Sequence, residues 1–145
     1  MGNKISRFRG NYEFLSNFYP CTISVDNLIF LSSEAAFQAF KCALAGEREQ
    51  FQYLDAVKAK KKGRQVLLKP DWEFVRLDVM SKIVRLKFEQ NPQLREKLLA
   101  TGSAELIEGN SWHDNFWGDC DCPKCQKITG QNHLGKILMK LRDSI

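Results

Sequence analysis

Long hydrophobic runs are missing from this chain of 145 residues. No stretch reaches the roughly 18 consecutive apolar residues of a membrane-spanning helix, so we expect no membrane partner. The N-terminus lacks the apolar core of a secretory signal, which predicts an intracellular, cytoplasmic protein. Internal repeats, low-complexity tracts and linkers are also lacking, and the length predicts a single domain over residues 1–145.

The cysteines are unevenly distributed. Of the five cysteines, Cys21 and Cys42 stand alone, whereas Cys120, Cys122 and Cys125 cluster. The odd number and the clustering do not match the disulfide framework of a small secreted protein. The remaining composition, 43% apolar and 27% charged, is that of an ordinary globular protein, and the net charge of +5 suits anionic partners such as nucleotides, phosphorylated metabolites and nucleic acid.

Periodicity and turn residues predict an α+β fold, a mostly helical single domain around a small β-sheet. Short strands on either side of Asp26-Asn27 predict a hairpin. Ser32-Ser33 is typical of a helix start, and Asn91-Pro92 predicts another. The expected strands are residues 21–25, 28–31 and 104–107, and the expected helices are residues 34–44, 47–62, 71–90, 93–99 and 134–145.

The helix predicted at residues 34–44 is apolar on most sides but carries Glu34, Gln38 and Lys41. Their i, i+4 and i+7 spacing places them on one helix face. A polar stripe on such a helix faces water, a partner or a cavity that uses it. The spacing alone leaves a solvated stripe and a functional face equally open.

Residues 108–119 match neither the helix nor the strand period and predict a loop between Gly109 and Gly118. The loop must bury its aromatic residues or expose them to stack on a ligand. A packed surface loop with solvated acids is the alternative. Its aromatic and acidic residues are Trp112, Phe116, Trp117, Glu108, Asp114 and Asp119.

Carboxylates in an aromatic-lined cleft can perform acid–base catalysis or stabilise a cationic, sugar-like transition state. Glu34, Asp114 and Asp119 are the candidates. Trp72, Trp112 and Trp117 could stack on a base or a flavin-like ring, or could pack in the core. Arg64 could bind a phosphate through its guanidinium fork.

Several ordered stretches between residues 8 and 142 together resemble the NADAR family, also called the YbiA-like family. They are Phe14-Leu15-Ser16-Asn17-Phe18, Ser33-Glu34-Ala35-Ala36-Phe37-Gln38-Ala39-Phe40-Lys41, Gly63-Arg64, Trp72, Asp114-Asn115-Phe116-Trp117-Gly118-Asp119 and Gly130-Gln131-Asn132-His133-Leu134-Gly135. The resemblance implies a YbiA-like fold and an N-glycosidase, a hydrolase that cleaves a ribose–nitrogen bond. The implied substrates are early phosphorylated riboflavin-pathway intermediates or ADP-ribose linked to a base, including ADP-ribosylated guanine in nucleic acid.

The resemblance also assigns residues. Glu34, Trp72 and Asp114 match positions regarded as functional in the riboflavin-linked branch. The positions expected to shape the substrate pocket are Asn17, Phe18, Arg64, Trp117, Gly118 and Asn132. To these we add Gln38 and Asp119 from the patterns described above as substrate-binding candidates.

Lys41 is a third catalytic candidate, because a lysine desolvated beside a buried helix can have a lowered pKa and act as a nucleophile. With an opened ribose it would form a Schiff base at the anomeric carbon. The alternative is a simple ion pair with Glu34 or with a phosphate.

The cysteine cluster departs from the riboflavin-linked pattern, where a glycine-rich segment is expected after Trp-Gly-Asp. Cys120, Cys122 and Cys125 offer three soft ligands, and His133 or His113 could supply a fourth for a structural zinc ion. The alternative is a loop of reduced cysteines. No other cofactor is expected.

Two further functions compete with the enzyme. A non-catalytic ADP-ribose or nucleic-acid binding module would keep the aromatic and basic residues but would not need Glu34 or Asp114. Nonspecific nucleic-acid binding through the basic run of residues 58–64 would depend strongly on salt. Substitution of Asp114 by alanine separates enzyme from module, because only the enzyme loses turnover.

Overall fold

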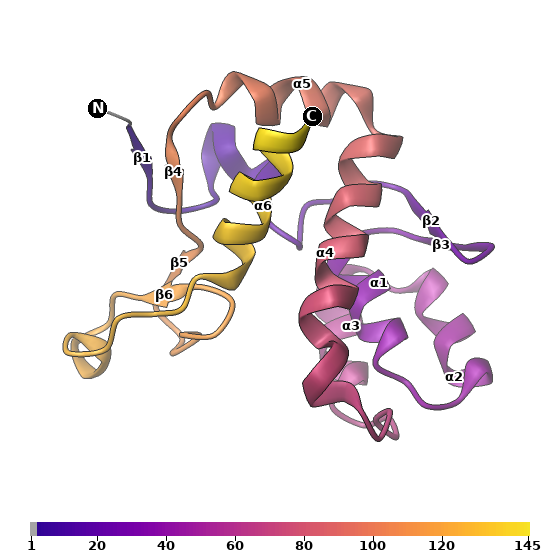
Figure 1. The fold of residues 1–145 in the computed structure, drawn as a ribbon. Helices are drawn as coiled ribbons and strands as arrows, with labels where there is room; N and C mark the ends of the chain where they lie inside the picture. The colour runs from indigo at the N-terminus through magenta and orange to yellow at the C-terminus, as the bar shows by residue number, and fades with distance from the viewer. Residues whose placement is uncertain (1–2) are drawn as a thin grey trace. The chain divides into compact units, whose positions relative to one another are not determined.

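The computed structural model describes residues 3–145, which form two compact units (Figure 1). We call Asn17–Arg95 the middle unit, and the segment up to Ser16 together with Glu96–Ile145 the terminal unit. The chain passes from the terminal to the middle unit after Ser16 and returns inside helix α5 (Pro92–Ala100). Helices dominate, and the strands form two-stranded pairs, so the predicted α+β class is confirmed.

The middle unit places a β-hairpin beside a long helix (Figure 1). The predicted hairpin is confirmed as β2 (Ile23–Val25) paired antiparallel with β3 (Leu28–Phe30). Asp26 and Asn27 have φ angles of 50° and 68°, the left-handed values that a two-residue type I′ turn requires. The strand β2 packs on α4 (Trp72–Gln90), which is the long helix predicted at residues 71–90.

Helix α1 (Ser33–Phe40) lies at the centre of this unit, in contact with α3 (Ala56–Gly63) and α4. The Ser32 hydroxyl accepts a hydrogen bond from the Ala35 amide, as the N-cap prediction requires. The helix is buried on every side, which explains its nearly continuous apolar sequence. It ends at Phe40 rather than at residue 44, because Cys42 forms a β-bridge with Leu68 instead of another helical turn.

Two other predictions about this unit were wrong in detail. The helix expected at residues 47–62 is broken into α2 (Ala45–Glu49), a 3₁₀ helix (Gln50–Tyr53) and α3. The break falls at Asp55, whose carboxylate caps α3 by accepting the Lys58 amide. The apolar face predicted for this helix from Val75, Leu77, Val79, Met80, Ile83, Val84 and Leu86 is buried at Met80, Ile83 and Val84, but Leu77 is exposed. The residues that α4 buries are Trp72, Met80, Ile83, Val84, Lys87 and Phe88.

Lys87 is an unusual member of that core, with 1% of its surface exposed. Its ammonium lies 6.0 Å from the ring centre of Tyr19 and 5.3 Å from that of Phe88. Burial lowers the pKa of Lys87 to about 8, although the nearby Cys21 thiol acts in the opposite direction. The charge of Lys87 therefore depends on pH within an ordinary experimental range.

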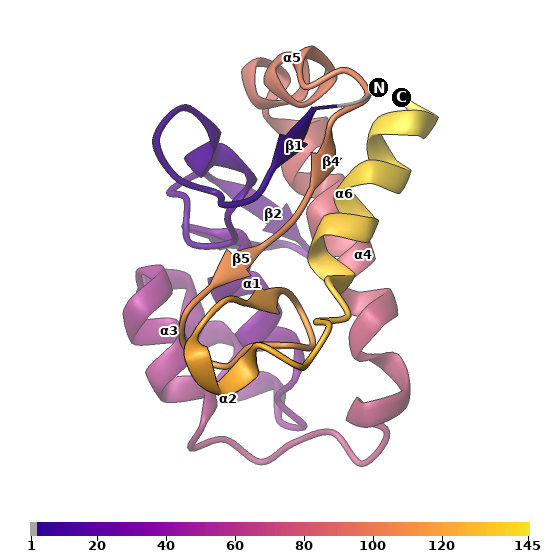
Figure 2. The ribbon, with the colours of Figure 1, turned by 90° about the vertical axis from the view of Figure 1, so that its left-hand side faces the viewer.

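In the terminal unit, β1 (Lys4–Ile5) pairs in parallel with β4 (Glu105–Leu106), and α6 (His133–Ser144) packs beside β4 (Figure 2). A 3₁₀ helix covers Gly10–Leu15. A second parallel pair, β5 (Gly109–Asn110) with β6 (Asp119–Cys120), holds together the two ends of the loop predicted at residues 108–119. Within residues 3–145, no helix combines the length and apolar content that crossing a membrane demands.

Candidate active site

The polar face of α1 is buried. Glu34 and Gln38 are only 7% and 6% exposed, so they do not form a solvated stripe. The side-chain amide of Gln38 donates to Glu34 Oε1 over 3.0 Å. A charge-assisted bond in a buried site is stronger than a neutral one and restricts the carboxylate to one orientation. Gln38 therefore positions Glu34.

The end of α3 approaches this face closely. A Cβ atom at Gly63 would lie 1.9 Å from Gln38 Oε1 and 3.2 Å from Lys41 Cε. Only glycine allows such an approach, and this explains why glycine precedes Arg64. Within residues 3–145, Gln38 Oε1 is a buried oxygen that accepts no hydrogen bond.

Lys41 follows the last residue of α1 and keeps a right-handed helical conformation. Burial lowers the pKa of its amine, the Glu34 carboxylate acts to raise it, and Arg64 acts to lower it. These influences place Glu34 and Arg64 in the electrostatic neighbourhood of Lys41. A lowered pKa increases the fraction of neutral, nucleophilic amine near neutral pH.

Asn17 connects the chain entering the middle unit with the start of α1. Its backbone carbonyl accepts the Glu34 amide over 3.0 Å, and its Oδ1 accepts the Ser33 hydroxyl over 2.9 Å. The side chain is buried and also donates to the Met80 sulfur. Asn17 thus fixes the backbone that carries Glu34.

The two aromatic candidates of this unit differ in exposure. Phe18 is 39% exposed, lies 5.6 Å from the Lys60 ammonium and lines a cavity of about 610 Å³. Trp72 is 7% exposed and packs against Phe37 with ring centres 5.1 Å apart. Phe18 therefore has a face for a ligand, whereas most of Trp72 is used in the core.

In the terminal unit, the loop that carries Asp114 is organised by Asn110, which is fully buried. Its Oδ1 accepts the amides of Trp112 and Asp114 over 3.2 and 3.1 Å, and its Nδ2 donates to the Asp114 carbonyl over 2.8 Å. The Asn110 side chain thus supplies the backbone hydrogen bonds that a helix or a sheet would otherwise provide.

The Asp114 carboxylate caps the next turn of the loop. Its Oδ1 accepts the amides of Phe116 and Trp117 over 3.1 and 2.9 Å. Oδ2 accepts no hydrogen bond from residues 3–145. At Gly118, a Cβ would lie 2.0 Å from the Glu108 carbonyl oxygen, so this close backbone approach also requires glycine. The carboxylate is held by one oxygen, and the other remains available.

The first turn of α6 supports the same loop from its other side. The amides at a helix start have no partners within the helix, and here they donate to loop carbonyls. Asn132, His133 and Leu134 donate to the carbonyl oxygens of Gly118, Phe116 and Trp117, respectively.

Asn132 and Asp119 are also tied to the backbone. Asn132 Oδ1 accepts the Glu108 amide and its Nδ2 donates to the Leu106 carbonyl, each over 2.9 Å. Asp119 Oδ1 accepts the Gly130 amide over 2.9 Å. The contacts of these two predicted substrate-binding residues are those of groups that hold the loop in place.

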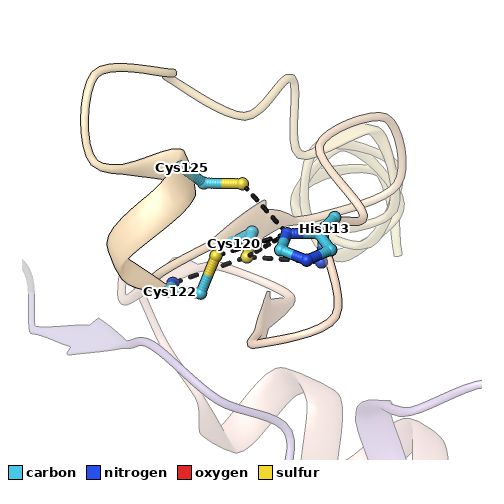
Figure 3. A group of neighbouring side chains, drawn as sticks. All are labelled: His113, Cys120, Cys122 and Cys125. Atoms are coloured by element: carbon cyan, nitrogen blue, oxygen red, sulfur yellow. Dashed lines mark hydrogen bonds between the residues drawn. The ribbon is translucent and has the colours of Figure 1, made fainter.

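The three clustered cysteines converge on His113 (Figure 3). One ligand atom from each of the four residues lies within 4.8 Å of the others. His113 Nδ1 is 3.3 Å from Cys122 Sγ, 3.4 Å from Cys125 Sγ and 4.0 Å from Cys120 Sγ. A group with this composition and spacing could hold a metal ion.

Of the two histidines considered as a fourth ligand, the structure places His113 and not His133 beside the thiols. The His133 ring lies 4.6 Å from the Phe116 ring, and its Nε2 is 2.8 Å from Gln131 Oε1. His133 begins α6, and its side chain packs on the loop instead.

The family follows from comparison with known proteins. The family model of the NADAR domain matches residues 6–145. The chain belongs to the NADAR family. The N-glycosidase YbiA of Escherichia coli (strain K12) is 38% identical over 138 residues, which cover 93% of this chain and 82% of YbiA. The NMR structure of E. coli YbiA matches with a TM-score of 0.83 and 36% identity, covering 99% of this chain and 86% of that one.

Two more relatives show the range of the family. An N-glycosidase from Nostoc punctiforme is 32% identical over 92% of this chain and 86% of its own length. A riboflavin biosynthesis protein from Vibrio vulnificus is 41% identical over 93% of this chain, which spans 36% of the length of that protein.

Within this NADAR chain, the predicted residues form two groups. Glu34, Gln38 and Lys41 come together in the middle unit, with Arg64 nearby. The second group belongs to the terminal unit. Its members are Asp114, Trp117, Gly118, Asp119 and Asn132.

Sequence reasoning missed Asn110 and the packing role of Gly63. Asn110 lies inside the loop that composition singled out, and its small polar side chain in a segment without regular structure was the available signal. Nothing in the local sequence indicates the approach of Gly63 to Gln38, because that contact is between two helices.

Proposed function

We propose that this NADAR chain is a hydrolase that cleaves the N-glycosidic bond between C1′ of a ribose and a nitrogen atom in a phosphorylated ribosyl compound. The observation that carries the proposal is the half-buried Lys41, whose pKa burial lowers, beside a Glu34 carboxylate held by Gln38. Activated lysines of this kind attack carbon centres at the carbonyl oxidation level, which is the oxidation level of C1′.

In the proposed reaction, the neutral Lys41 amine attacks C1′ and the C1′–nitrogen bond breaks. Glu34 takes the proton that Lys41 loses and delivers it to the departing nitrogen. The C1′–O4′ bond then opens, O4′ takes a proton from solvent, and a protonated Schiff base forms between Lys41 and the sugar; the water that later adds to C1′ returns this proton to solvent. Water adds to C1′, the C1′–Nζ bond breaks, and the free amine and the released sugar are formed.

Asp114 is the second carboxylate of the proposal. Its Oδ1 is fixed by the amides of Phe116 and Trp117, and its Oδ2 is left to accept a proton. From its match to the family motif we propose it as a second catalytic carboxylate, because a hydrolase requires a general base for water. Phe18 and Trp112, two exposed aromatic residues next to predicted site residues, are proposed to stack on a base.

The charge of the chain and of α3 favours a phosphorylated substrate. Lys58, Lys61 and Arg64 are exposed along or just after α3, within a chain of net charge +5. The Vibrio relative named as a riboflavin biosynthesis protein supports an early phosphorylated riboflavin intermediate. ADP-ribosylated guanine in nucleic acid is the other substrate that we propose, because it has the same bond and the same anionic groups.

A product assay tests the function. The wild type, Glu34→Gln and Lys41→Arg are incubated separately with the phosphorylated riboflavin intermediate and with DNA carrying ADP-ribosylated guanine. Lys82→Arg is the matched control, because Lys82 is an exposed lysine of the same unit. We expect sugar release by the wild type and by Lys82→Arg only. Binding of either compound without release by the wild type would instead support the non-catalytic module.

A further inference from the structure

We propose that His113, Cys120, Cys122 and Cys125 bind one zinc ion with four protein ligands, and that this ion holds the Asp114 loop in its working conformation. The first half of the proposal does not depend on the N-glycosidase. The second half rests on the proposed function of Asp114.

The spacing of the ligand atoms matches tetrahedral zinc. With Zn–S and Zn–N bonds of ordinary length, a tetrahedron has edges of about 3.8 Å between sulfurs and about 3.6 Å between nitrogen and sulfur. The three distances from His113 Nδ1 to sulfur are 3.3, 3.4 and 4.0 Å. Each of these distances is within about 0.4 Å of the ideal edge, and the four ligand atoms all lie within 4.8 Å of one another.

The local backbone also favours ligation. Cys122-Pro-Lys-Cys125 closes a short turn in which the Cys125 amide donates to the Cys122 carbonyl over 3.0 Å, and this turn brings the two sulfurs to the same side. His113 has a φ of 71°, in the left-handed region that is uncommon for residues other than glycine, and its ring points to the thiols in this conformation (Figure 3).

Donor groups around the sulfurs suit thiolates. The amides of His113 and Cys122 point to Cys120 Sγ over 3.3 and 3.5 Å, and the side-chain amide of Asn115 points to Cys125 Sγ over 3.4 Å. Binding would release the three thiol protons to solvent. The resulting site, with three thiolates and one dication, has a net charge of −1 that these N–H groups offset.

The chemistry of the ligands selects the metal and its role. Three thiolates and one imidazole form a common structural zinc set, and softer ligands disfavour magnesium or calcium. All four coordination positions are occupied by protein, so no position remains for water or substrate. The ion would therefore be structural.

The cluster is directly connected to the Asp114 loop. His113 precedes Asp114 in the chain, and Asn115 follows it. The Asn115 side chain donates to Cys125 Sγ and accepts the Cys120 amide over 2.9 Å. Fixing the four ligands thus fixes both neighbours of Asp114, and their release would free this part of the loop.

Metal analysis of the full-length protein, purified without chelator from zinc-supplemented medium, tests the binding. We expect about one zinc ion per chain in the wild type. His113→Ala and Cys125→Ala should each lose at least ten-fold in zinc affinity, since the loss of an outer-shell partner alone typically costs about 10- to 100-fold. Cys21→Ser and His133→Gln are the matched controls and should retain the ion.

A spectroscopic arm keeps the test valid if a ligand variant does not fold. Cobalt(II) exchanged into the wild-type protein should give the visible bands of a tetrahedral ion and a thiolate charge-transfer band. A substoichiometric zinc content together with no tetrahedral cobalt spectrum would overturn the proposal, as would a Cys122–Cys125 disulfide in the purified protein.

Hydrogen exchange tests the effect on the loop. Removing zinc from the wild type should accelerate amide exchange of Asp114, Phe116 and Trp117 at least ten-fold, while α4 stays protected. Turnover should fall with the same zinc dependence. Unchanged exchange after complete zinc loss would refute the positioning role. A zinc-bound protein with an ordered loop and no turnover would instead count against the proposed function.

Discussion

Gly63→Ala gives a sharp test of how the buried face of α1 is organised. Gly63 is the last residue of α3, so alanine by itself should favour the helix by up to about 1 kcal/mol. The new Cβ, however, would lie 1.9 Å from Gln38 Oε1. Because ordinary contacts begin near 3.4 Å, the Gln38 amide must move by about 1.5 Å.

That movement breaks the 3.0 Å hydrogen bond from Gln38 to Glu34. Hydrogen bonds to a charged group contribute about 1.5–3 kcal/mol to stability. After the gain in helix propensity is subtracted, the net loss in stability should be about 1 kcal/mol, which corresponds to about 3 °C in melting temperature for a chain of this size. The effect on kcat should be much larger, at least about ten-fold, because Glu34 loses the group that orients it.

The assay is a double-mutant cycle with Gln38→Ala, measured by urea unfolding and by turnover. In the Gln38→Ala background the clash is absent, so Gly63→Ala should be neutral or stabilising by up to about 1 kcal/mol. If Gly63→Ala destabilises both backgrounds equally, or changes neither stability nor turnover in the wild type, the reasoning about this contact is refuted.

Three other predictions concern Lys87, Asn110 and Lys41. The pKa of Lys87 is about 8 in the folded protein and 10.5 ordinarily, so the folded state binds fewer protons between these values and its stability rises with pH there. Relative to Lys87→Met, the wild type should gain about 3 kcal/mol in free energy of unfolding between about pH 7 and about pH 10.5. Urea unfolding of the two proteins, measured in parallel across this range, checks the gain. A difference in unfolding free energy that stays the same at every pH would contradict it. Asn110→Ala should cost about 3 kcal/mol, because it leaves three part-buried backbone groups of Trp112 and Asp114 without their partner. Asn110→Asp should also destabilise the protein, since it replaces the donor to the Asp114 carbonyl. Calorimetric melting of either variant close to that of the wild type would argue against this role. Burial lowers the Lys41 pKa and Glu34 acts to raise it. The pKa of the Lys41 amine, followed by competitive labelling at a series of pH values, should therefore lie below its ordinary value, and lower still in Glu34→Gln. A higher Lys41 pKa in that variant would contradict the interaction between the two groups.

Local sequence signals predicted much of the fold. The Ser32 cap, the Asp26-Asn27 turn and the Asn91-Pro92 start each act through the backbone of a few neighbouring residues. The hydroxyl–amide bond of Ser32 and the positive φ angles of the turn are the interactions that those signals imply. Such elements can be recognised without knowing what packs against them.

Tertiary contacts account for the features that the sequence did not reveal. Lys87 lies one turn after Ile83 and Val84, on the face of α4 that packs inward, but its polar side chain gave no local sign that it would be buried. Residues 47–62 have helical composition throughout, but the Asp55 cap restarts the helix. Asn110 becomes important only because a loop without regular structure folds around its side chain.

The candidate site shows the same division. Helical spacing placed Glu34, Gln38 and Lys41 on one face, and the Gln38–Glu34 bond confirms that two of them meet. The spacing alone could not show whether that face was solvated or buried. The choice between His113 and His133 beside the cysteines likewise depended on where the loop turns.

The most direct test of the central claim is reductive trapping with borohydride during turnover of a phosphorylated N-ribosyl substrate, followed by mass spectrometry of the digested protein. Our account predicts a sugar adduct on Lys41, formed by the wild type and by Lys82→Arg and absent from Lys41→Arg. Continued turnover by the wild type with Lys41 unmodified, or an adduct on another lysine, would contradict it.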